Sequence, residues 1–127
     1  MKTALQDLID QLDERLTEFE ADGVDLNVDH EFIANLVGSD EVLRPTHTQL
    51  IADGFSGDPP EDGGWIYMHV WRPLTRSSVL QLAEQLDALA QQNRCLFELL
   101  DVTLTSGSKS GHIIILGACD GETLQNA

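Results

Sequence analysis

The chain has 127 residues, of which 42% are hydrophobic and 23% are charged, values typical of a folded globular protein and not of a disordered one. No stretch approaches the roughly 18 consecutive apolar residues of a membrane span, and the first residues lack the apolar run of a secretory signal. We therefore expect a single domain in the cytoplasm. The formal net charge of −15 disfavours direct binding to nucleic acid or to an anionic membrane.

The acidity is concentrated in the first half of the chain. Residues 1–62 hold 16 Asp and Glu against 3 Lys and Arg, a balance of −13, whereas residues 63–127 hold 6 against 4, a balance of −2. Such a field attracts basic proteins over long range, and the attraction weakens as salt rises. Two interpretations stay open: the charge steers a basic partner, or it keeps the protein soluble or adapts it to a salt-rich cell.

The first segment predicts an amphipathic helix that ends near Asp22. Apolar residues recur at helical spacing, and acidic residues occupy other positions. The apolar stripe must pack either on the rest of the domain or on the same helix of a second subunit, and packing within the domain is the commoner solution. The stripe comprises Leu5, Leu8, Leu12, Leu16 and Phe19, and the acids are Asp7, Asp10, Glu14 and Glu18.

The segment that follows is ambiguous. Residues 24–28 alternate like a short strand or form a loop. Asp29 is suited to capping a helix that carries Phe32, Ile33, Leu36 and Val37. Pro45 excludes a helix interior at its own position, so we expect a short separate helix over residues 46–53.

Later elements have clearer patterns. Residues 56–64 have turn chemistry at nearly every position and predict a loop before a strand over residues 65–71. An amphipathic helix is predicted over residues 78–92, with Ser78 opening a capping box. Two apolar segments, 95–105 and 112–118, should pair as an antiparallel hairpin around a flexible loop.

This order of elements predicts an α+β fold. Helices, a strand, a helix and two strands suit an antiparallel sheet that is covered by helices on one face, a two-layer sandwich that is ferredoxin-like or related. Residues 1–22 would form an additional N-terminal helix, and residues 23–127 the sheet-and-helix core of the same domain.

The strand over residues 65–71 carries the most informative pattern. Alternation sends three apolar side chains to one face and a set of amphipathic aromatic side chains to the other. Such residues dominate the hot spots of protein interfaces, so an exposed stripe would bind a partner. Alternatively, the N-terminal helix covers the stripe as part of the core. The stripe consists of Trp65, Tyr67, His69 and Trp71.

Catalytic and metal-binding patterns are absent from the sequence. The four histidines lack metal-ligand spacing, Cys95 and Cys119 are expected as buried thiols, and the loop acids Asp58 and Glu61 lack the order of a calcium loop. Ser77 and Ser78 suit helix caps better than a nucleophile elbow. We therefore expect a non-catalytic protein with no cofactor. The histidines are His30, His47, His69 and His112.

Three segments resemble the family of regulators of ribonuclease activity B. They are a helix that ends in Asp53-Gly54-Phe55, the strand from Gly64 to Val70, and a helix with a Leu-Ala pattern over residues 82–90. The resemblance covers less than half of the chain. It implies a small, acidic, ferredoxin-like protein without catalytic activity that binds and restrains an RNA-degrading enzyme, and it assigns no functional residue.

The sequence therefore favours a regulator or inhibitor of a basic protein, a nuclease or another nucleic-acid enzyme included. The acids would steer the partner, as in nucleic-acid mimicry, and the aromatic stripe would bind it. One alternative is an accessory subunit that dimerises through its N-terminal helix. Another is a small-molecule-binding domain with a pocket lined by Tyr67, His69 and Trp71.

Overall fold

The computed structural model describes residues 3–119, in which helices and strands alternate until a final hairpin. The loops between them are short, except for the turn-rich segment of residues 53–64. The elements in chain order are α1 (Ala4–Ala21), β1 (Asp29–Val37), α2 (Asp40–Ala52), β2 (Trp65–Pro73), α3 (Arg76–Asn93), β3 (Leu96–Thr103) and β4 (Ile113–Ala118).

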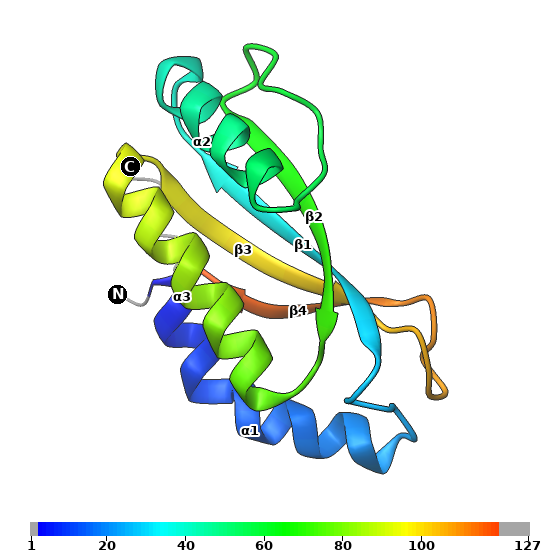
Figure 1. Ribbon diagram of the computed structural model, residues 1–127. Coiled ribbons are helices and arrows are strands. Elements are labelled where there is room, and N and C mark those ends of the chain that lie inside the picture. Colours follow the sequence, from blue (N-terminus) through cyan, green and yellow to red (C-terminus); the bar gives the residue numbers. More distant parts are fainter. Residues whose placement is uncertain (1–2, 120–127) are drawn as a thin grey trace.

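The strands form one antiparallel sheet in the order β2-β1-β3-β4, and the three helices of the described chain lie on one of its faces (Figure 1). Helix α1 packs on β4 and α3, and α2 packs on β2 and the other side of α3. The predicted two-layer α+β sandwich is confirmed. After α1 the order is β-α-β-α-β-β, which departs from the β-α-β-β-α-β order of ferredoxin-like folds. The fold is thus of a related kind.

The predicted N-terminal helix is confirmed as α1. Thr3 caps it with a complete capping box, in which its side chain accepts from the Gln6 N–H and the Gln6 side chain accepts from the Thr3 N–H. The buried residues of α1 belong to the same apolar cluster as the sheet. The apolar stripe is therefore filled within the domain and is not available for pairing with a second copy.

The prediction of a helix that carries Phe32, Ile33, Leu36 and Val37 is wrong, because this segment is the strand β1. Its buried side chains alternate with less buried ones in the period of two that defines a strand, and the strand pairs with β2 on one side and β3 on the other. Residues 24–28 form a turn instead of a strand. The side chains that point to the helices are His30, Phe32, Ala34 and Leu36.

The expected break at Pro45 is also wrong, since α2 begins at Asp40 and runs through the proline. A proline at this position deprives only the carbonyl of Glu41 of its helical donor. Both residues are exposed, so water can satisfy that carbonyl.

Helix α3 and the hairpin agree with the sequence, with a different cap. Thr75 caps α3 by accepting from the Ser78 N–H, so the helix begins at Arg76, two residues before the predicted start at Ser78. The strands β3 and β4 pair as expected. The hairpin loop contacts the turn after α1, where the Asp25 N–H donates to Ser106 Oγ at 2.9 Å.

Candidate protein-binding face

The face of the sheet that points away from the helices, here called the open face, carries large apolar side chains in contact with solvent. Trp65, Tyr67 and Trp71 of β2 are 43%, 47% and 52% exposed, and Ile113 and Ile115 of β4 are 58% and 50% exposed. The alternative that α1 covers the aromatic stripe is wrong, because α1 packs on β4 from the opposite face. The predicted stripe is therefore accessible to a partner.

Strand register places these side chains in rows across the sheet. One row joins Trp71, Glu31, Thr103 and Ile113, and the next joins His69, Ile33, Asp101 and Ile115. Aromatic residues thus border the open face along β2, isoleucines border it along β4, and the two central strands bring polar groups between them. The β2 border follows from the alternation in the sequence, whereas the β4 border was not predicted.

The polar groups of the open face include three carboxylates, those of Glu31, Glu98 and Asp101. Glu31 Oε2 lies 3.8 Å from His69 Nδ1, and the side-chain amide of Asn35 donates to Glu98 Oε2 at 3.0 Å. Arg72 is the only Lys or Arg in the described strands, and alternation points it to the covered face, as it does its buried neighbour His30. The face therefore offers hydrogen-bond acceptors and negative charge within an apolar border.

Two acceptors at the centre of the open face lack partners. Asp101 Oδ1 and Asn35 Oδ1 are both buried, and neither accepts a hydrogen bond from the described residues. Burial raises the pKa of the Asp101 carboxyl, and Asn35 is only 5% exposed. A buried acceptor without a donor costs about 1–3 kcal/mol, so these two oxygens lower the stability of the fold.

The acidic residues predicted to bind with the stripe lie elsewhere. Asp10, Glu14 and Glu18 are exposed on α1, in the helix layer and on the other side of the sheet from the aromatic stripe. Asp7 is partly buried, where its carboxylate accepts from the Ala118 N–H at 3.2 Å and from Gln11 Nε2 at 2.7 Å. Asp7 thus ties α1 to β4, and one contact surface cannot contain both predicted groups.

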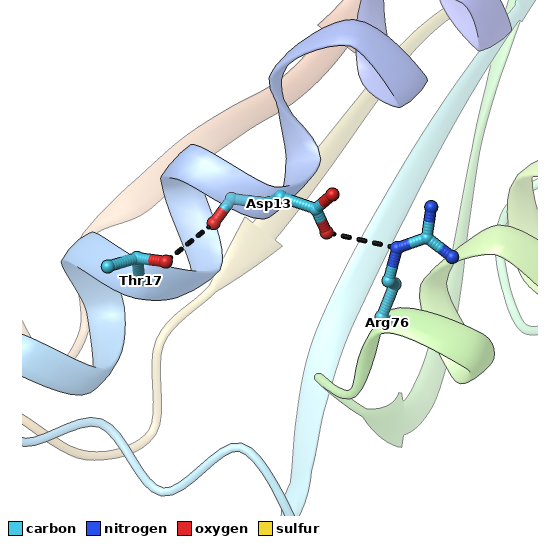
Figure 2. A network of polar contacts seen from close by, with 3 residues as sticks. All are labelled: Asp13, Thr17 and Arg76. Carbon is cyan, nitrogen blue, oxygen red and sulfur yellow. Dashed lines mark hydrogen bonds and ion pairs between the residues drawn. The ribbon is translucent and has the colours of Figure 1, made fainter.

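One ion pair of the described chain connects two elements of the helix layer. Figure 2 shows Asp13 of α1 beside Arg76 of α3, with 3.0 Å between Oδ1 and Nε, while Thr17 Oγ1 donates to the Asp13 carbonyl. Both charged side chains are largely exposed, so the pair stabilises the fold by less than about 1 kcal/mol. These contacts explain part of the acidity of α1 without any partner.

The other residues singled out in the sequence have structural surroundings. His30 is fully buried, and its Nε2 lies 2.7 Å from the Asp25 carbonyl while its Nδ1 accepts from the Thr105 N–H at 3.0 Å. Cys95 and Cys119 are partly buried, and burial raises the pKa of both thiols. Across residues 3–119, no cluster of His, Cys, Asp and Glu is suited to hold a metal ion.

No family model, curated protein or solved structure matches the chain. Within the described range, no helix combines the length and the apolar composition needed to cross a membrane.

Proposed function

We propose that this protein is a small, acidic, non-catalytic regulator or inhibitor that binds a basic protein partner through the open face of its sheet. The observation that carries the proposal is the open face itself, where half-exposed aromatic and isoleucine side chains border carboxylates and the described strands place no Lys or Arg. Exposed apolar groups of this size and grouping mark interaction surfaces.

The chemistry of the open face supports a partner that is both apolar and cationic. Tryptophan and tyrosine supply contact area with little loss of side-chain freedom, and they are enriched in interface hot spots. Glu31, Glu98 and Asp101 accept hydrogen bonds from Lys or Arg, and such charge-assisted bonds are stronger than neutral ones.

The acids of α1 contribute to the same function at a distance. Because Asp10, Glu14 and Glu18 lie in the helix layer, they add to the field that draws a basic partner in and do not contact it on the open face. A cytoplasmic nuclease or another nucleic-acid enzyme is the class of partner that the sequence resemblance implies, since its phosphate-binding surface is basic.

Self-association is less well supported. The apolar stripe of α1 is buried in the domain, and two copies that each carry −15 repel one another across any shared interface. A dimer formed through the open face would bring Glu31, Glu98 and Asp101 of both copies together without counter-charges.

The proposal is tested by quantitative capture of proteins from a lysate of the source cell with matched isoleucine variants. Ile113→Ala with Ile115→Ala removes apolar area from the open face, and Ile9→Ala with Ile51→Ala removes similar area from the helix layer, where both are about 45% exposed. We expect one basic protein that binds at low salt, is lost at high salt, and is reduced at least about tenfold by the first pair alone. Equal capture by both pairs would contradict the proposal.

A further inference from the structure

A cavity of about 450 Å³ opens at the edge of the sheet, between β2 and the turn-rich loop that precedes it. The loop runs back along β2, where Ser56 and His69 exchange two backbone hydrogen bonds of 2.9 and 2.7 Å. His47 Nε2 of α2 holds the loop from behind at 2.9 Å from the Gly57 carbonyl. The lining includes Ser56, Asp58, Glu61, Trp65, Tyr67 and His69, whereas Trp71 lies outside it.

Two glycines let the loop backbone lie close to β2 and to the ring of Trp65. A Cβ atom at Gly57 would lie 2.4 Å from the Tyr67 carbonyl oxygen, so only glycine lets the loop lie this close to β2. A Cβ atom at Gly63 would lie 2.3 Å from Cζ3 of Trp65, which shows that the indole ring rests on the loop backbone. The Trp65 side of the aromatic wall therefore packs against the loop backbone.

The wall consists of two rings at an angle. The centroids of Trp65 and Tyr67 are 5.9 Å apart, the ring planes are tilted by 50°, and both side chains are about half exposed. The face of an aromatic ring attracts a cation, most strongly when the ring belongs to tryptophan. Such a pair can contact a cationic group from two directions.

The charge of the lining also favours a cationic ligand. Asp58 and Glu61 add two carboxylates, and no Lys or Arg contributes to the lining. An anionic ligand would therefore be repelled by the carboxylates and by the ring faces, whereas a cationic ligand would be attracted by both.

We infer that this cavity receives an arginine side chain of the partner protein, an inference that rests on the proposed function and names its anchor. The planar guanidinium stacks on the ring of Trp65 or Tyr67 and donates in pairs to the carboxylates of Asp58 and Glu61. Lysine would place a compact, strongly hydrated charge there and lose the stacking. The cavity adjoins the aromatic border of the open face, so one partner can occupy both.

The inference is tested by NMR titration of the protein with N-acetyl-arginine amide, followed at the indole N–H of Trp65, which Trp65→Phe assigns. We expect a saturable chemical-shift change with a dissociation constant of about 1 mM, the weak affinity expected of a single side chain. The matched control is N-acetyl-citrulline amide, which has the same shape without the charge, and we expect it to bind at least about tenfold more weakly. Equal binding of the two compounds, or no saturable shift with the arginine compound, would overturn the inference.

Charge-removing variants show whether the loop carboxylates take part. Asp58→Asn with Glu61→Gln should weaken binding of the arginine compound about tenfold, whereas Glu20→Gln with Glu84→Gln removes the same charge from exposed positions of the helix layer and should leave it nearly unchanged. An equal effect of both pairs would mean that the overall negative charge of the protein, and not the cavity, attracts the arginine compound, and it would overturn the inference. Capture of a partner through the open face is measured separately with the isoleucine variants, so either result can fail without the other.

Discussion

The two faces of the sheet are built from the same strands and differ in every property that matters for binding. The covered face contains Phe32, Met68 and Leu100, all fully buried beneath the helices, and it supplies the core. The open face contains side chains that are as large, at alternate positions of the same strands, and leaves them half exposed beside carboxylates. The covered face supplies the core, and the exposed side chains of the open face are the basis of the proposed binding to a partner.

The largest expected difference between the faces is in stability. Phe32→Ala on β1 should lower the free energy of unfolding by about 3–5 kcal/mol, because it leaves a cavity in the core. The neighbouring Ile33→Ala acts on the open face, where solvent reaches the side chain, and should cost less than about half as much. Urea denaturation of both variants measures the difference. Similar losses for the two would mean that the open face is covered.

Two histidines, one on each face of the sheet, should differ in their contribution to stability by a smaller amount. His30→Ala removes a buried ring that connects the Asp25 carbonyl to the Thr105 N–H, and should destabilise the protein by about 2–3 kcal/mol. His69→Ala removes a ring from the open face whose partner, Glu31, lies at 3.8 Å, and should change stability by about 0.5 kcal/mol or less. Thermal unfolding at neutral pH distinguishes the two. A large loss for His69→Ala would assign its ring to the fold instead of to binding.

The smallest expected effect concerns the partnerless carboxyl at the centre of the open face. Since burial raises the pKa of Asp101 in the folded protein, the native state holds the proton more tightly than the unfolded chain, and stability falls as pH rises from about 4. Asp101→Asn should therefore stabilise the protein at pH 7, by less than about 1 kcal/mol because solvent still screens the group. The gain should disappear below about pH 4, where the carboxyl is protonated in both states.

The measurement is a series of urea denaturations of the two proteins between pH 4 and pH 7. A loss of stability in Asp101→Asn at pH 7 would mean that the carboxylate has a donor in the free protein.

Elements with one consistent period could be predicted from the sequence. Leu8, Leu12 and Leu16 mark α1 at helical spacing, and the alternation from Trp65 to Trp71 marks β2. Strand β1 could not be recognised in this way, because Phe32 and Leu36 are also four residues apart and fit a helix as well. Pairing with β2 on one side and β3 on the other stabilises the strand, and this pairing depends on residues far away in the sequence.

The candidate site was predicted in part for the same reason. Alternation identifies the members of the aromatic stripe but does not tell which face of the sheet the helices cover. The exposure of Ile113 and Ile115 could not be predicted, because Ile114 between them is also apolar and β4 therefore lacks an alternating pattern. The cavity depends on the return of the loop along β2, which the glycines at positions 57 and 63 permit but do not specify.

The central claim is that a partner binds the open face and not the helix layer, and site-specific photo-crosslinking tests it most directly. A photoreactive phenylalanine derivative is placed at Trp71 on the open face or, in the control, at Gln91, which is exposed on α3. We expect the same basic protein to be crosslinked from Trp71 at low salt and not from Gln91. Crosslinking of that protein from Gln91 with none from Trp71 would contradict the account and assign binding to the helix layer.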